Sequence, residues 1–266
     1  MIKAIIFDWA GTTVDYGCFA PMQVFKQVFC ERGIEITDRE AREPMGMQKR
    51  DHIAAICSQE RVSALWEEKY GHAPTENDID ELYAQFEPAL FRILHQYGEP
   101  LEGVADMVLK LKDDGLKIGS TTGYTKEMMD VIVPVAKAHG YAPDCLVTPN
   151  EVPAGRPYPW MIYENMKHLG IDSKDEVMKI GDTVSDMQEG RLAGVWTVGV
   201  IEGSSELGLG KHEVESLSEE ALNERKQEVH KRLIEHGAHL VINRITDVPQ
   251  AIRHIEMLLA TGGRAL

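Results

Sequence analysis

The 266-residue chain is poor in cysteine and in positive charge, and it has no long hydrophobic run. Its four cysteines show no CxxC spacing, which argues against a thiol metal or redox motif and favours a reduced, cytoplasmic protein. Lysine and arginine number 28 against 43 acidic residues, a formal net charge of −15. This balance argues against nucleic acid or an anionic membrane as the main partner. No apolar run reaches transmembrane length, and we expect no signal peptide, because Met1 leads directly into a strand.

Hydrophobic residues are present in sufficient number for a substantial core, at 43% of the chain. Residues 4–7 form an unbroken apolar run, typical of a strand covered by helices on both faces. Asp8 follows at the carboxyl end of this strand, where open α/β sheets bind ligands. Gly11 permits a sharp turn, and Thr12 and Thr13 offer hydroxyl and N–H groups to an anion. The alternative is an acidic residue that only ends a strand before a glycine turn.

The pattern of helices and strands divides the chain into two parts. Residues 20–98 have helical spacing and no convincing strand, whereas helices and strands alternate after residue 99. This order predicts an α/β protein, a doubly wound parallel sheet interrupted after its first strand by an all-helical cap domain. We expect a core domain over 1–17 and 100–266 and a cap domain over 18–99. The later strands are predicted over residues 116–121, 145–147, 177–180, 195–201 and 238–242.

The predicted helices follow from apolar spacing and from capping residues. Thr37 and Thr75 have the sequence context of helix N-caps, and Thr37 opens a capping box. In the cap, helices are predicted over 21–32, after Thr37, and over 47–57, 62–70 and 76–97. In the core, helices are predicted over 103–114, 125–139, 157–169, 185–193, 211–232 and 248–259.

Three further strand ends carry polar side chains. Thr122 follows one strand, Arg156 precedes the helix predicted at Pro157, and Asp182 and Asp186 follow another strand. Each residue alone could be a turn, a helix cap or a surface ion pair. Because the carboxyl ends of parallel strands meet at one edge of a sheet, we expect these side chains to gather around Asp8.

The chemistry of this group is coherent. Asp8, Asp182 and Asp186 are hard oxygen donors suited to Mg²⁺. Thr122 and Arg156 could hold phosphoryl oxygens, with Arg156 at a helix N-terminus. Asp8 could then attack phosphorus and form an aspartyl phosphate.

The order Asp8, Thr122, Arg156, Asp182, Asp186, with a helical cap after the first strand, resembles the haloacid dehalogenase superfamily over nearly the whole chain. Phosphatases and phosphomutases of that superfamily carry a second aspartate two residues after the nucleophile, as the general acid and base. Here that position is Ala10, which could offer only its backbone carbonyl to the metal. A leaving alcohol or sugar oxygen could therefore not be protonated in the usual way.

The cap segment 44–52 supplies another reactive group. If this segment enters a helix, Met45, Lys49 and His52 lie at i, i+4 and i+7 on one face. A lysine packed beside methionine and near Arg50 can have a lowered pKa and act as an amine nucleophile. The alternative, a solvated surface lysine, is the commoner case for a single lysine.

Segments 8–17, 119–124 and 153–160, together with this cap segment, closely resemble the phosphonoacetaldehyde hydrolase family. The resemblance implies a small-molecule phosphonate as substrate and Mg²⁺ as cofactor. It also implies that Lys49 forms a Schiff base with the aldehyde while Asp8 takes the phosphoryl group, so that the C–P bond breaks to give acetaldehyde and phosphate. A homodimer through the caps is a further implication.

The resemblance also includes several further residues of the expected site. Thr122 and the adjacent Gly123 fall in the phosphate-binding stretch. The other side chains that could shape the pocket or relay protons are Cys18, Met45, His52 and Tyr124, with ordinary packing as the alternative for Cys18 and Met45. Two competing functions are a Mg²⁺-dependent phosphatase or phosphomutase, against which Ala10 argues, and a non-catalytic binding protein on the same fold.

Overall fold

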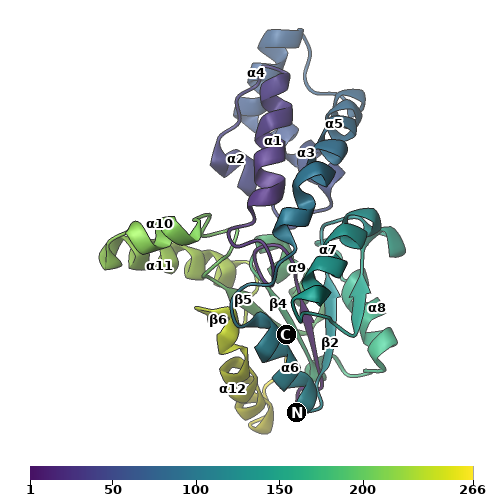
Figure 1. Cartoon of the computed structure of the whole chain (residues 1–266), viewed down its shortest axis with the longest axis vertical. Helices are drawn as coiled ribbons and strands as arrows, with labels where there is room; N and C mark the ends of the chain where they lie inside the picture. The colour runs from purple at the N-terminus through teal and green to yellow at the C-terminus, as the bar shows by residue number, and fades with distance from the viewer. Residues whose placement is uncertain (266) are drawn as a thin grey trace.

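A computed structural model describes residues 1–265, and these contain a six-stranded sheet in which every neighbouring pair of strands is parallel (Figure 1). The strand order is β3-β2-β1-β4-β5-β6, so β1 lies inside the sheet between β2 and β4. The strands are β1 (Ala4–Phe7), β2 (Lys117–Thr121), β3 (Cys145–Val147), β4 (Val177–Gly181), β5 (Trp196–Val200) and β6 (Leu240–Ile242). This order confirms the doubly wound parallel sheet expected from the sequence.

Helices cover both faces of the sheet, as the unbroken apolar first strand predicted. Ile5 and Phe7 of β1 face one large hydrophobic cluster, and Ala4 and Ile6 face a second, smaller cluster. The first cluster includes residues of α6 (Val104–Asp113), α7 (Lys126–Ala138) and α12 (Val248–Ala260). The opposite face is covered by α8 (Trp160–Leu169), α9 (Val184–Ala193) and α11 (Glu219–Glu235).

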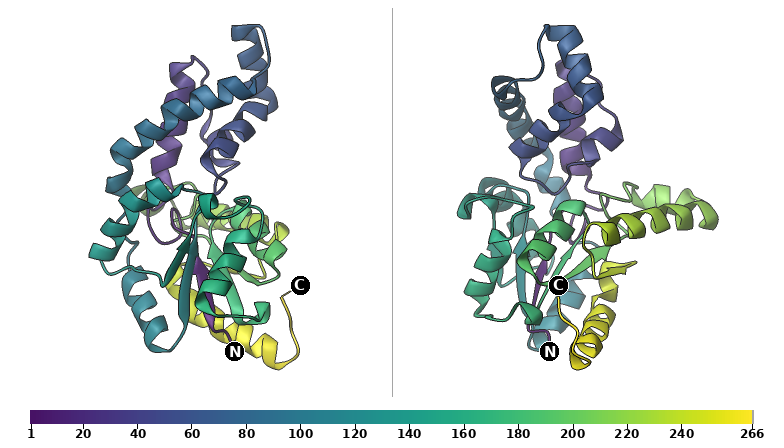
Figure 2. Two further views of the ribbon diagram at one scale, coloured as in Figure 1. Left: turned by 90° about the vertical axis from the view of Figure 1, so that its right-hand side faces the viewer. Right: turned by 180° about the vertical axis from the view of Figure 1, so that it is seen from behind.

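Five helices between β1 and α6 form a separate bundle above the carboxyl edge of the sheet (Figures 1 and 2). They are α1 (Phe19–Glu31), α2 (Asp38–Arg42), α3 (Lys49–Ser58), α4 (Glu60–Tyr70) and α5 (Glu76–Leu94). Thr37 and Thr75 form the N-terminal capping boxes of α2 and α5. Inside the bundle, Phe25 of α1 stacks on Phe86 of α5 with ring centroids 4.4 Å apart. The domain boundaries given above stay a prediction.

Two segments connect this bundle to the sheet. The first bends sharply after β1, because Asp15 and Cys18 have φ angles of 52° and 53°, in the left-handed region. The Asp15 carboxylate accepts the backbone N–H groups of Phe19 and Ala20, at 2.9 and 3.0 Å, and so caps the start of α1. The second segment follows α5 through η1 (His95–Tyr97) and rejoins the first where the Leu101 N–H donates to the Thr13 carbonyl.

Two predicted helices differ from the structure. The helix expected at Pro157 begins only at Trp160, because Pro159 disfavours helical backbone at the residue before it. The helix expected over 211–232 is interrupted: α10 (Lys211–Ser216) ends, and Ser218 caps α11 by accepting the Ala221 N–H. Short helical turns complete the structure at η2 (Pro149–Glu151), η3 (Lys174–Glu176) and η4 (Ile245–Asp247). Within residues 1–265, no helix combines the length and the apolar character needed to span a membrane.

Candidate active site

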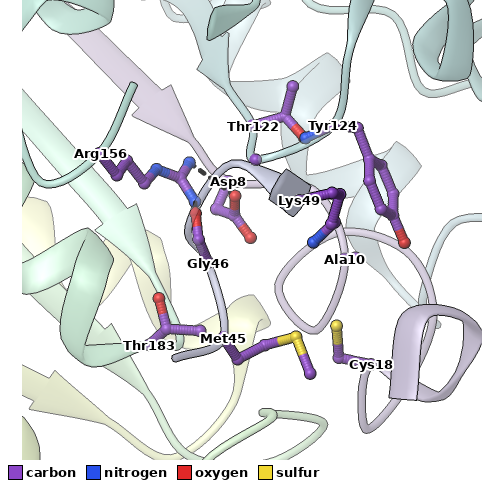
Figure 3. Close-up of a pocket in the computed structure, with 11 residues that line it drawn as sticks. Asp8, Ala10, Cys18, Met45, Gly46, Lys49, Thr122, Tyr124, Arg156 and Thr183 are labelled. Carbon is purple, nitrogen blue, oxygen red and sulfur yellow. Dashed lines mark hydrogen bonds and ion pairs between the residues drawn. The ribbon is translucent and has the colours of Figure 1, made fainter. Parts of the chain in front are cut away.

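A small cavity lies where the helical bundle meets the carboxyl edge of the sheet (Figure 3). The space in it that is not filled by atoms is about 260 Å³. It is lined by Asp8, Ala10, Cys18, Met45, Gly46, Lys49, Thr122, Gly123, Tyr124, Arg156 and Thr183. Side chains predicted from strand ends and from the cap segment thus meet around one cavity.

Asp8 and Arg156 face each other in this cavity. The backbone N–H of Asp8 donates to the Ile180 carbonyl at 2.8 Å, which holds Asp8 at the end of the paired strands β1 and β4. Its Oδ1 atom forms an ion pair with Nη2 of Arg156 at 2.6 Å, and both side chains are buried. Burial raises the pKa of Asp8, and the charge of Arg156 offsets this only in part. Asp8 therefore has one oxygen held by a cation and one oxygen, Oδ2, without such a partner.

Arg156 does not lie at a helix N-terminus, contrary to the expectation from the sequence. Because α8 begins only at Trp160, Arg156 precedes the helix by four residues, and its side chain forms an ion pair with Asp8. There it is surrounded by carboxylates: burial alone would lower its pKa, but Asp186 and Asp8 raise the pKa further above its ordinary value. Arg156 is therefore held by buried acids, and the N-terminus of α8 does not begin beside it as expected for a combined anion site.

The three aspartates form an acidic cluster. One carboxylate oxygen from each of Asp8, Asp182 and Asp186 lies within 4.8 Å of the others, and all three residues are buried. Asp182 accepts the Thr12 hydroxyl at 2.7 Å on Oδ1 and the Ser205 N–H at 2.7 Å on Oδ2. Burial and the charges of the other two aspartates raise the pKa of Asp182 well above its usual range. The cluster suits a divalent cation, whose charge would offset this repulsion.

The aspartates differ in their remaining capacity to accept ligands. Asp186 uses Oδ1 for ion pairs with Arg156 at 3.1 Å and Lys179 at 2.8 Å. Its Oδ2 accepts both the N–H and the hydroxyl of Thr183, at 3.2 and 2.6 Å. Asp186 is therefore the most heavily engaged of the three: two cations contact its Oδ1 and Thr183 occupies its Oδ2, although Oδ1 has no hydrogen-bond partner within the described residues. Asp182 keeps one free position on each oxygen, and Asp8 keeps Oδ2.

The charges around the cluster also fit a divalent ion. Four buried carboxylates face two buried cations: Asp8, Asp182, Asp186 and Glu189 against Lys179 and Arg156. When all are ionised, two negative charges remain without a counter-charge. Burying such an excess is costly, and one divalent cation would balance it.

Lys49 reaches the cavity from the cap side. It is the first residue of α3 and is only 3% exposed. Its Nζ lies 4.7 Å from the centre of the Tyr124 ring (Figure 3). Burial lowers the pKa of Lys49, partly offset by Cys18 and Asp8. A larger share of neutral amine is therefore present than for an exposed lysine.

Of the other residues predicted to lie in the pocket, three line the cavity and one does not. Cys18, Met45 and Tyr124 line the cavity, and the buried Tyr124 hydroxyl has no hydrogen-bond partner within the described residues. Burial raises the pKa of both the Cys18 thiol and the Tyr124 hydroxyl well above their usual values, so each stays protonated at neutral pH. His52 does not line the cavity: its Nε2 lies 2.8 Å from the Ala41 carbonyl.

His52 was expected on one helical face with Met45 and Lys49, but α3 begins only at Lys49. Met45 therefore lies in the loop before the helix, and His52 is buried inside the bundle with its ring 3.9 Å from that of Phe25. Burial and the nearby Lys49 lower the pKa of His52 well below its usual value. A neutral imidazole in this place is a packing group of the bundle.

The loop before α3 touches the sheet domain closely. A Cβ atom on Gly123 would lie 2.6 Å from the Met47 carbonyl oxygen and 2.7 Å from that of Gly46. A Cβ atom on Gly46 would lie 2.4 Å from Oγ1 of Thr183. Two glycines, one from each side, thus allow the loop to close over the cavity.

Comparisons with known proteins agree with this geometry. Haloacid dehalogenase-like hydrolases match residues 2–194 as a family, and a second hydrolase family of the same type matches residues 153–247. The phosphonoacetaldehyde hydrolases of Bacillus cytotoxicus and Bacillus mycoides are 56% and 54% identical to this chain over 255 residues, which is 96% of this chain and 97% of each relative. This chain belongs to the phosphonoacetaldehyde hydrolase family. The resemblance to haloacid dehalogenases seen in the sequence is confirmed, and the protein is a hydrolase.

A solved structure extends this likeness to the fold. The phosphonoacetaldehyde hydrolase like protein from Oleispira antarctica superposes with a TM-score of 0.95 at 36% identity, covering 99% of this chain and 95% of that protein. The likeness therefore includes the bundle above the sheet as well as the sheet itself.

Several residues of this family site were missed by the sequence analysis. Gly46 and Thr183 line the cavity, and Thr121, Lys179 and Glu189 form a buried network beneath it. Two signals were present. Lys179 is a charged residue inside an apolar strand, and Glu189 follows Asp186 by one helical turn on α9.

Proposed function

We propose that this protein hydrolyses the C–P bond of phosphonoacetaldehyde to acetaldehyde and phosphate. The observation that carries the proposal is the meeting of a buried lysine and a buried aspartate around one small cavity, with alanine at the position of the usual acid. Lys49 would bind the aldehyde end of the substrate, and Asp8 would face the phosphorus. The names of the closely related Bacillus proteins support the same substrate.

Lys49 is proposed as the amine that forms a Schiff base. Only the neutral amine attacks a carbonyl, and burial lowers the pKa of Lys49 in this direction. The attack releases water and leaves a protonated imine on Nζ. This cation, next to the C–P bond, can accept an electron pair.

Asp8 is proposed as the phosphoryl acceptor. Its carboxylate attacks phosphorus, the C–P bond breaks, and the bonding electron pair moves into the imine to give an enamine on Lys49. The enamine takes up a proton, and water then releases acetaldehyde and the free lysine. A second water hydrolyses the aspartyl phosphate, which returns Asp8 and gives phosphate. Because the leaving group is carbon, no acid is needed at Ala10 to protonate a leaving oxygen.

The phosphoryl group would be held by Arg156 and by the segment Thr122–Gly123, all of which line the cavity. Mg²⁺ would be bound by Asp8 and Asp182 with the Ala10 carbonyl, and Asp186 completes the acidic cluster. When bound, the ion supplies positive charge that lets an anionic substrate approach Asp8. The free acceptor positions on Asp8 and Asp182 support this assignment.

The decisive experiment measures acetaldehyde and phosphate released from phosphonoacetaldehyde, with and without Mg²⁺. Both products should appear in equal amounts and only with the metal. Turnover of phosphate esters or sugar phosphates, with none of phosphonoacetaldehyde, would instead establish the phosphatase or phosphomutase alternative.

Borohydride trapping tests the role of Lys49 directly. Reduction in the presence of substrate should inactivate the enzyme and leave the adduct on the peptide that contains Lys49. Lys49→Arg keeps a positive charge but cannot form the imine, so it should lose C–P cleavage, whereas Asp8→Asn should still be trapped but release no phosphate. Lys69→Arg, at an exposed lysine of α4, is the matched control and should behave as the unaltered protein. An adduct on another lysine would refute the mechanism.

Two expectations from the sequence stay predictions. One is a homodimer formed through the caps, which the mass of the protein in solution would test. The other is a cytoplasmic location, which fractionation of the source cells would test.

A further inference from the structure

The network beneath the cavity contains a lysine that is buried in the middle of the sheet. Lys179 of β4 has an exposed fraction of 0%. Its Nζ contacts three oxygens: Oγ1 of Thr121 at 2.7 Å, Oδ1 of Asp186 at 2.8 Å and Oε2 of Glu189 at 3.2 Å. The contact with Thr121 is a hydrogen bond, and the contacts with the two carboxylates are ion pairs. The cation is fully paired, although it has no contact with water.

Such a network is hard to explain by stability alone. Removing two charges from water is costly, and well-packed apolar side chains often stabilise a core at least as well as a buried ion pair. We therefore expect Lys179 to act by orienting the side chains that it contacts. Its partners Asp186 and Glu189 both also contact Arg156.

The guanidinium of Arg156 is fixed by the same partners. It has five N–H groups in a rigid plane, and five polar atoms lie within 3.5 Å of its nitrogens. Nε lies 2.9 Å from Oε2 of Glu189. Nη2 lies 2.7 Å from Oγ1 of Thr121 and 2.6 Å from Oδ1 of Asp8. Nη1 lies 3.1 Å from Oδ1 of Asp186 and 3.5 Å from the Gly46 carbonyl oxygen.

Glu189 has a special place among these partners. Its Oε2 is shared by Arg156, Lys179 and the Thr121 hydroxyl, so it links both cations to β2. Neither Glu189 nor Lys179 lines the cavity. Without the Glu189 charge, Nε of Arg156 would lose its charge-assisted hydrogen bond, and the guanidinium plane would be held less firmly toward Asp8.

We propose that Lys179 and Glu189 are positioning residues, which hold Arg156 in the orientation that binds the phosphoryl group. The N–H that would bind it is the one on Nη1 that faces the Gly46 carbonyl over 3.5 Å, the longest of the five contacts, at the cavity wall. This inference rests on the proposed function, in which Arg156 contacts that group. The pair acts through Arg156, so its loss should weaken phosphate binding and leave the chemistry of Lys49 intact. The aldehyde half and the phosphoryl half of the site would then respond separately to one substitution.

Glu189→Gln tests the proposal, since it removes the charge and keeps the shape. Affinity for inorganic phosphate, measured by calorimetry in the presence of Mg²⁺, should fall by about 10- to 100-fold, the range expected for a charge-assisted hydrogen bond. The KM for phosphonoacetaldehyde should rise by a similar factor. Trapping of Lys49 by acetaldehyde and borohydride should keep the rate of the unaltered protein. Glu164→Gln, at a glutamate of α8 that contacts Lys167 and His168, is the matched control.

The double variant Lys179→Met/Glu189→Leu removes one charge of each sign and keeps apolar packing, so it replaces Glu189→Gln if that protein does not fold. It should show the same loss of phosphate affinity with normal trapping. A folded variant that binds phosphate as tightly as the unaltered protein overturns the inference. Equal losses of phosphate binding and of trapping, or failure of both variants to fold, assign the network to the fold and also overturn it. Because calorimetry needs no turnover, an unaltered protein that does not cleave phosphonoacetaldehyde refutes the proposed function separately.

Discussion

Gly123→Ala tests whether the loop before α3 must seat on the sheet domain during turnover. The variant keeps the backbone N–H at position 123 and needs no unusual φ angle. Its Cβ would lie 2.6 Å from the Met47 carbonyl oxygen, whereas ordinary contacts begin at 3.4 Å. The loop would have to withdraw by about 0.8 Å, and with it Lys49, two residues further on. A misplacement of about 1 Å can lower a rate by about 100-fold, or about 2.7 kcal/mol of barrier.

We therefore expect kcat/KM for phosphonoacetaldehyde to fall by about 100-fold in the acetaldehyde-release assay, with little change in thermal unfolding. Gly155→Ala is the matched comparison, because its Cβ would meet Pro149 at 3.2 Å and Gln48 only at 3.6 Å. Its neighbours need to move by only a few tenths of an ångström. If Gly123→Ala loses no more activity than Gly155→Ala, the seating of the loop is not required and the reasoning is refuted.

Two further substitutions separate the roles of the acidic residues. Asp182→Asn should weaken Mg²⁺ binding, measured by calorimetry, more than Asp186→Asn does, since Asp186 is already held by two cations and by Thr183. The reverse order would contradict the metal assignment. Burial raises the pKa of Asp15 from 3.8 to about 7, so the folded protein favours the protonated carboxyl. The stability that the protonated carboxyl contributes is complete below about pH 4 and is lost as the pH rises through 7. The free energy of unfolding of the unaltered protein, relative to Asp15→Asn, should therefore fall by up to about 4 kcal/mol between pH 4 and pH 8 in urea denaturation; a constant difference would show that the carboxyl is ionised in the folded protein at every pH in this range.

The sheet could be predicted because each strand has a recognisable pattern in its own short segment of sequence. The apolar run of β1 required cover on both faces, and the parallel order then placed Asp8, Thr122 and Asp182 at one edge. The structure brings these residues together, and their chemical roles stay predictions. Arg156 also lies beside Asp8 as expected, but it does not stand at the start of a helix. Pro157 resembled a first helical residue, and the effect of Pro159 on the residue before it was overlooked.

The parts that sequence could not give depend on packing between distant segments. Lys179 and Glu189 meet through β4 and α9, and only their joint contact with Arg156 reveals a network. His52 was assigned to the pocket on helical spacing and on the family resemblance of the cap segment. That spacing does not apply to Met45, because the helix starts at Lys49, and the imidazole turned into the bundle instead.

The enclosed position of Lys49 has a consequence for selectivity among amines and aldehydes. An aldehyde in open solvent could react with any exposed lysine, whereas the amine proposed to bind it belongs to Lys49, which is only 3% exposed. The same burial limits which molecules can reach Lys49, whose Nζ lies 4.7 Å from the centre of the Tyr124 ring. Burial beneath the cap would thus limit the adducts that Lys49 forms with other aldehydes.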